Sequence, residues 1–135
     1  EWGMARVGGA RMPKGYVQFE ARAFHRGPDG RVGTGDDVDL GVVDASWSLE
    51  EYSATLNDDD IEFVGELNRN TGLFTPAADG PNPERSGHRN NIGDVWVVAS
   101  HVPPGMSDER PLRARSHLIV TVPLYMRWDP WGDIP

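Results

Sequence analysis

The sequence predicts an all-β domain folded as an antiparallel β-sandwich. Short stretches in which apolar and polar side chains alternate recur along the chain, and helical periodicity is almost absent. Turn residues separate these stretches: the 135 residues include 16 Gly and 11 Pro, one residue in five, against roughly 12 % in average proteins. Six or seven short strands separated by turns within one domain are typical of a β-sandwich.

Alternation locates the expected strands. In residues 16–25, Val17, Phe19, Ala21 and Ala23 alternate with polar side chains, as in a strand with one buried face. Further strands are expected at residues 38–47, 61–67, 73–75, 94–101 and 113–125. Only residues 48–52 suggest a turn of helix.

Two of these strands have a clear core face. Val95, Val97 and Ala99 fall on one side of the strand at 94–101, opposite Trp96 and Val98. In the last strand, Leu118, Val120 and Val122 lie opposite His117, Ile119 and Thr121. These apolar side chains are therefore candidates for the core.

Turn chemistry supports the boundaries. Gly27-Pro28-Asp29-Gly30 is typical of a type I or II turn, because Pro fixes φ and Gly accepts a positive φ. Residues 70–72 predict a tight hairpin that joins the strand ending at residue 67 to the one beginning at residue 73. Residues 80–91 form a long irregular connection, and connections of that length are usually functional or lie at an interface.

Composition excludes several classes of function. The chain has no Cys, which rules out disulfides, thiolate metal sites, Cys nucleophiles, haem attached through cysteine and cysteine-derived quinones within it. Its formal charge of -8 disfavours nucleic acid and anionic lipid as partners. The longest apolar stretch, residues 118–126, is far shorter than the ~20 residues of a transmembrane helix, and residues 1–4 carry no signal-peptide pattern.

One loop is a candidate calcium site. Asp29, Asp36, Asp37 and Asp39 can supply the hard oxygen ligands that Ca²⁺ requires, although their spacing is not that of an EF-hand. The alternative is an Asp/Gly-rich hairpin loop whose carboxylates accept hydrogen bonds from backbone N–H groups. A second acidic run, at residues 57–60, is expected to be a solvated approach to a strand.

The sequence predicts no active site. The four histidines, His25, His88, His101 and His117, show no metal-ligand spacing, and no Gly-x-Ser-x-Gly motif occurs. We therefore expect neither catalytic nor cofactor-binding residues in this chain, with calcium as the one possible ligand.

The last thirteen residues form a candidate docking segment. Residues 123–135 contain three Pro together with the residue types enriched at protein interfaces. The candidate contact residues are Tyr125, Met126, Arg127, Trp128 and Trp131. The alternative is that this tail folds back on its own domain, which we place at residues 1–122.

A local pattern resembles bacterial immunoglobulin-like domains. It consists of Trp47-Ser48, a hairpin of the form Asn-x-x-Gly-Leu-Phe-Thr and a strand of the form Gly-x-Val-x-Val-x-Ala. This resemblance implies an immunoglobulin-like sandwich and says nothing about chemistry.

A longer resemblance covers residues 5 to about 122. Its most specific part is Gly80-Pro81-Asn82-Pro83-Glu84-Arg85 followed by Asn90-Asn91. Other matching stretches lie in the same order along the chain, at residues 5–9, 27–37, 41–48, 58–65, 72–76, 93–99 and 118–122. Together they resemble the last domain of the α subunit of quinohemoprotein amine dehydrogenase. Residues 1–4 and those from Pro123 onward are expected to depart from that family's pattern and to suit docking.

The resemblance implies a scaffold. In that family the haems belong to another domain of the α subunit, and a tryptophylquinone cross-linked to cysteine belongs to a separate small subunit. A chain without Cys carries neither group. We therefore expect a non-catalytic structural or accessory domain that makes protein contacts in a periplasmic or otherwise extracytoplasmic electron-transfer complex. The alternatives are an excised domain of an amine dehydrogenase and a calcium-stabilised binding module.

Overall fold

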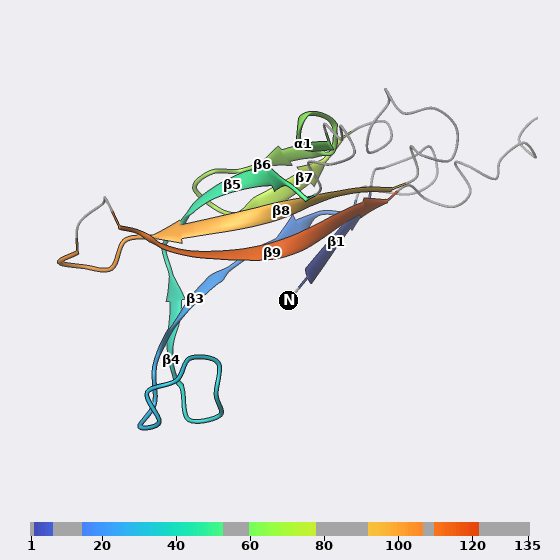
Figure 1. Ribbon diagram of the computed structural model, residues 1–135. Helices are drawn as coiled ribbons and strands as arrows, with labels where there is room; N and C mark the ends of the chain where they lie inside the picture. The colour runs from blue at the N-terminus through green and yellow to red at the C-terminus, as the bar shows by residue number, and fades with distance from the viewer. Residues whose placement is uncertain (1, 7–14, 53–59, 78–91, 107–109, 122–135) are drawn as a thin grey trace, which may run out of the picture.

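The structure is a computed structural model that describes residues 2–6, 15–52, 60–77, 92–106 and 110–121 (Figure 1). Every structural statement below concerns these residues. Their elements are β1 (Trp2–Arg6), β2 (Val17–Gln18), β3 (Ala21–His25), β4 (Val38–Val43), β5 (Ser46–Glu51), α1 (Asp60–Phe63), β6 (Gly65–Leu67), β7 (Leu73–Pro76), β8 (Ile92–His101) and β9 (Leu112–Thr121). Among these described residues, no helix is long and apolar enough to cross a bilayer.

The strands form one large and two small sheets. The large sheet has four strands in the order β1-β9-β8-β5, in which β1 runs parallel to β9 and the other pairs are antiparallel. The sheet β2-β7-β6 is antiparallel, and so is the two-stranded sheet β3-β4. The chain passes from β2 into β3 with only two residues between them, so one extended segment serves both small sheets.

The core lies between the large sheet and β2-β7-β6. It is built from side chains of both sheets and of the α1–β6 junction, so the two sheets pack face to face. Its buried members are Ala5, Trp47, Val64, Phe74, Val95, Val97, Leu118 and Val120. This arrangement confirms the predicted all-β sandwich and the predicted core faces of the strands now labelled β8 and β9. The immunoglobulin-like subclass stays a prediction.

The β3–β4 hairpin extends away from the rest of the molecule (Figure 1). Its register shifts between Ala23 and Phe24, because Ala23 pairs with Gly41 whereas Phe24 pairs with Asp39. Leu40 is the extra residue of this β-bulge, and Gly41 adopts a φ of 91°, a conformation that glycine takes without strain.

Two expectations about local structure were wrong, and one strand was missed. Residues 48–52 do not form a helical turn, because Ser46–Glu51 pairs with β8 along its whole length. The strand expected at residues 61–67 is a turn of helix, α1, followed by the short strand β6. No strand was predicted at the beginning of the chain, yet Trp2–Arg6 pairs with β9 in parallel as an edge of the large sheet.

The acidic run also differs from the expectation. Asp60, the one member of residues 57–60 that the structure describes, is fully buried. Its Oδ2 accepts a hydrogen bond of 2.9 Å from the backbone N–H of Asp94, and its carbonyl accepts one of 2.9 Å from Val64 N–H. This carboxylate therefore joins α1 to β8 in the interior instead of facing solvent.

Candidate functional site

The Asp/Gly loop closes the far end of the projecting hairpin, between β3 and β4 (Figure 1). It begins with the predicted turn, in which Gly30 N–H donates a 3.0 Å hydrogen bond to the Gly27 carbonyl and Gly30 adopts a φ of 69°. Gly30 is the last residue of this turn, the position at which type I turns favour glycine.

The loop gathers three of the four predicted calcium ligands. The carboxylates of Asp29, Asp36 and Asp37 offer oxygen atoms that all lie within 4.8 Å of one another. Each carboxylate also accepts a backbone hydrogen bond within the loop: Asp29 from Arg31 at 2.8 Å, Asp36 from Asp29 at 3.0 Å and Asp37 from Gly33 at 2.7 Å. The same side chains thus fit both sequence hypotheses, a cluster of oxygen ligands and a loop that caps its own backbone.

Thr34 adds a hydroxyl to this cluster. Its Oγ1 donates a 2.7 Å hydrogen bond to Asp36 Oδ1. This bond, followed in size by the backbone hydrogen bond from Asp29, lowers the pKa of Asp36 below its usual value. Asp36 is therefore held in its charged form at the centre of the loop.

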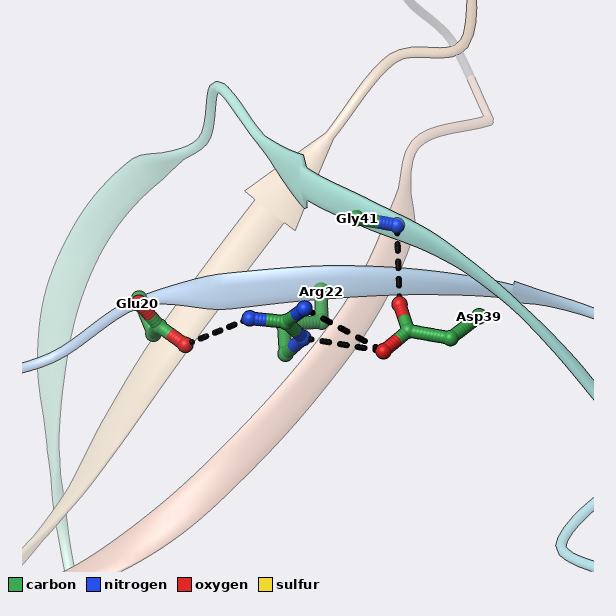
Figure 2. Close-up of polar contacts among 4 residues, drawn as sticks. All are labelled: Glu20, Arg22, Asp39 and Gly41. Atoms are coloured by element: carbon green, nitrogen blue, oxygen red, sulfur yellow. Dashed lines mark hydrogen bonds and ion pairs between the residues drawn. The ribbon is translucent and has the colours of Figure 1, made fainter.

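Asp39, the fourth predicted ligand, lies outside that group because it belongs to β4. Figure 2 shows its carboxylate between two donors: Gly41 N–H at 2.8 Å from Oδ1, and Arg22 Nη2 at 3.2 Å from Oδ2. Arg22 also contacts Glu20 through Nη1, at 3.0 Å. The Gly41 bond, and then the Arg22 contact, lower the pKa of Asp39, while the pKa of Arg22 is raised chiefly by its hydrogen bond to Glu20.

The strands of the hairpin expose large apolar side chains. Phe24 is 58 % exposed, and Leu40 and Val42 on β4 are 60 % and 59 % exposed. Beside the hairpin lies a groove of about 540 Å³, open to solvent. Its walls come from β2 and β3 on one side and from the inner face of β8 and β9 on the other, and they include Phe19, Phe24, Trp47, Val97, Ala99 and Ala114.

The outer face of the large sheet carries an aromatic cluster that the sequence reasoning missed. Tyr52 stacks on His117 with ring centroids 3.9 Å apart, and Trp96 lies 4.9 Å from Tyr52. The Arg115 guanidinium carbon lies 4.2 Å above the Trp96 ring. Alternation had placed Trp96 and His117 on outward faces, but pairing of these two residues requires the β8–β9 register, which the sequence does not reveal.

The described histidines contact carbonyl or carboxylate oxygens. His25 Nδ1 lies 2.6 Å from the Arg26 carbonyl, and His101 Nδ1 lies 2.6 Å from the Asp44 carbonyl. His117 Nε2 lies 3.1 Å from Asp94 Oδ2. None of these three contacts joins a histidine to a hydroxyl, the pairing by which histidine activates a serine or threonine nucleophile. His88, the fourth histidine, and the candidate docking residues Tyr125 to Trp131 lie outside the described residues.

A comparison with protein families decides what the chain is related to. The model of one family, described as quinohemoprotein amine dehydrogenase, alpha subunit domain IV, matches residues 1–131. The chain belongs to this family. The resemblance drawn from the sequence is therefore confirmed. A search of curated proteins gave no match.

The domain IV match corrects one detail of that resemblance. Residues 1–4 and 123–131 were expected to depart from the family pattern, yet the match includes both segments. For residues 2–4 the structure supplies the physical reason, because β1 is an integral edge strand of the large sheet. Family membership therefore applies to the sandwich and to most of the tail.

Proposed function

We propose that this domain IV is a non-catalytic structural domain, which works by making protein contacts within a larger electron-transfer complex. The observation that carries the proposal is the projecting β3–β4 hairpin with its exposed apolar strands. A two-stranded sheet is only marginally stable by itself in water, and an exposed apolar patch commonly marks an interaction site. We expect another domain or subunit of the same amine dehydrogenase to cover it.

The geometry of the hairpin supports a contact of this kind. Phe24, Leu40 and Val42 are all more than half exposed, and the neighbouring groove leads from the hairpin to the inner face of β8 and β9. Burial of apolar surface is the dominant favourable contribution to most protein–protein association. Another polypeptide seated along the hairpin would thus gain most of its binding free energy from these side chains.

Composition supports the non-catalytic part of the proposal. Haem of the c type is attached through cysteine, and the quinone of this enzyme family is cross-linked to cysteine. With no Cys, this chain offers neither attachment point. The redox chemistry of such an enzyme would then take place in other parts of it, and domain IV would contribute to their arrangement. Because such enzymes are extracytoplasmic, we propose a periplasmic or other extracytoplasmic location for this chain as well.

The tail is the second proposed contact segment. Tyr125, Met126, Arg127, Trp128 and Trp131 are residue types that contribute strongly to protein interfaces. Truncation after Val122 is expected to abolish co-purification with the partner and to leave the fold intact. Co-purification of the truncated chain at the same level would remove the tail from the proposal.

The mass of the native polypeptide distinguishes two forms of the proposal. A species of 14.9 kDa in the source organism, measured by mass spectrometry, would make the chain a free-standing accessory subunit. A much longer polypeptide would make it one domain of an amine dehydrogenase subunit, an oxidoreductase by membership.

A calcium-stabilised loop is the second candidate function. It is favoured by the gathering of Asp29, Asp36 and Asp37 within 4.8 Å, three carboxylates at one hairpin end. A ligand that binds only the native state raises its stability. A melting temperature that rises in excess Ca²⁺ and falls again on addition of EGTA would support this candidate. An unchanged melting temperature at millimolar Ca²⁺ would remove it.

A further inference from the structure

The outer face of the large sheet combines arginine with aromatic side chains. Strand pairing sets Trp96 opposite His117 and Val98 opposite Arg115, and Arg115 leans back over the Trp96 ring. Tyr52, 42 % exposed, extends the aromatic surface at the end of β5. Tryptophan, tyrosine and arginine are the residues that contribute most to the free energy of protein–protein binding.

Arginines dominate the charge at the beginning of β9. Arg113 and Arg115 are both exposed and, because they are two residues apart on one strand, they point to the same face, about 7 Å from each other. The described part of the chain gives neither guanidinium an ion-pair partner, whereas Arg22 is paired with two carboxylates. Two arginines without an ion-pair partner among the described residues thus stand together in a chain whose formal charge is -8.

Contact with Trp96 orients one of these cations. A guanidinium that lies over an aromatic ring uses its flat face for that contact and keeps its N–H donors, which lie in its plane, available for a carboxylate. Since Arg115 is already held over Trp96, less conformational entropy is lost when it binds an anion. The stacked arginine is thereby prepared for a second, charged ligand.

A shallow hollow lies beside the two arginines. It has a volume of about 290 Å³, and Val98, which is only 5 % exposed, contributes to its apolar lining. Arg113 and Arg115 border it along β9, and Glu50 borders it along β5. A bound carboxylate is therefore favoured on the β9 side of the hollow, and Glu50 repels it from the other.

We propose that this surface, defined by Arg113, Arg115, Trp96 and Val98, binds an extended acidic segment of a partner polypeptide whose carboxylates occupy alternate positions. In an extended chain, side chains two residues apart lie on one side at the same spacing of about 7 Å as the two arginines. Apolar residues of the segment contact the half-buried Trp96 and the floor of the hollow at Val98. The proposal rests on the proposed function, because it names the chemistry of one partner of the structural domain.

The test uses the full 135-residue chain and a short fluorescein-labelled peptide with Glu at alternate positions and Leu between them. Fluorescence anisotropy should show salt-dependent binding. The double variant Arg113→Gln/Arg115→Gln should bind about tenfold more weakly or worse, as loss of two charge-assisted contacts implies. The matched control Arg26→Gln/Arg31→Gln removes two arginines from the β3–β4 segment and should change the affinity by less than about twofold.

Two further probes define the ligand class. A peptide of the same composition with its Glu residues adjacent should bind more weakly, because only one carboxylate then reaches an arginine. In a heteronuclear NMR titration, the Trp96 indole signal and the amides of residues 113–116 should shift on addition of the alternating peptide. Trp96→Phe should weaken binding less than the arginine pair does, and folding of every variant is checked by circular dichroism.

Several results would overturn the proposal: no binding of the alternating peptide, equal weakening by both arginine pairs, or tighter binding of a single-stranded oligonucleotide than of the acidic peptide. Peptide binding to this surface and association through the β3–β4 hairpin are measured separately, so either can fail alone. Loss of this binding with hairpin-dependent association preserved would overturn this surface alone, whereas the reverse pattern would overturn the proposed function and leave this surface in place.

Discussion

The indole ring of Trp47 packs directly against Gly72. A β carbon added to Gly72 would lie 2.7 Å from Trp47 Cε2 and 2.9 Å from the Phe19 carbonyl oxygen, and Gly72 also has a φ of 73°. Through this contact, the turn between β6 and β7 fits against the core tryptophan of β5. Space and backbone conformation therefore both require glycine at this position.

The first prediction concerns this glycine. Gly72→Ala should destabilise the domain by more than about 2 kcal/mol. A positive φ alone costs a residue with a β carbon up to about 2 kcal/mol, and steric overlap with Trp47 adds to that cost. Gly30→Ala is the matched control: its φ is 69°, but no atom of the described residues lies within 4 Å of an added β carbon. Urea denaturation followed by Trp fluorescence measures both. Equal losses of stability would show that the Trp47 contact contributes nothing.

The second prediction compares two neighbours on β7. Phe74 is fully buried in the core, whereas Leu73 is 37 % exposed on the other face of the strand. Phe74→Ala should cost about 3–5 kcal/mol because it leaves a cavity between the sheets. Leu73→Ala should cost much less, since part of the leucine is already in water. Thermal unfolding followed by circular dichroism decides; similar melting temperatures for the two variants would contradict the assignment of the core.

The third prediction concerns the acid limb of stability. Asp39 has its pKa lowered by the Gly41 N–H and by Arg22, so the folded state holds its proton less tightly than the unfolded state does. This contribution to stability is fully present above the unfolded pKa of about 3.9 and is lost as the pH falls through the lower, folded pKa. The Asp39→Asn variant should therefore be less stable than the unmodified chain at pH 7, and the stabilities of the two should become equal in acid.

A matched variant controls for the removal of charge. Glu66→Gln takes one carboxylate from the exposed side of β6, where no ion pair is recorded among the described residues. Its difference in melting temperature from the unmodified chain should change less with pH than that of Asp39→Asn. A constant difference between Asp39→Asn and the unmodified chain from pH 7 down to acid would show that the Arg22 and Gly41 contacts do not favour the charged form.

Local patterns were enough to predict the core strands. The alternation around Val95, Val97, Leu118 and Val120 identifies buried faces because a strand repeats every two residues, whatever its partner. The turn of residues 27–30 was predictable for a similar reason, since the preferences of Pro28 and Gly30 act locally. In both cases the decisive interaction lies within a few residues of the pattern.

Contacts between distant residues explain what could not be predicted. Asp60 looked like part of a solvated acidic run, and its burial depends on Asp94, 34 positions away. Asp39 was grouped with the loop carboxylates because it is close to them in sequence, but the register of the hairpin directs it toward Arg22. The cluster of Tyr52, Trp96 and His117 likewise needs three strands in register.

The most direct test of the structural role measures binding of the immobilised 135-residue chain to the other polypeptides of its enzyme, quantified by mass spectrometry. Leu40→Ser/Val42→Ser changes exposed side chains of β4, so the fold should survive while binding falls at least about tenfold. Met4→Ser/Met106→Ser, which changes similarly exposed apolar residues outside the hairpin, should bind as the unmodified chain does. Undiminished binding of the Leu40→Ser/Val42→Ser variant would contradict the account.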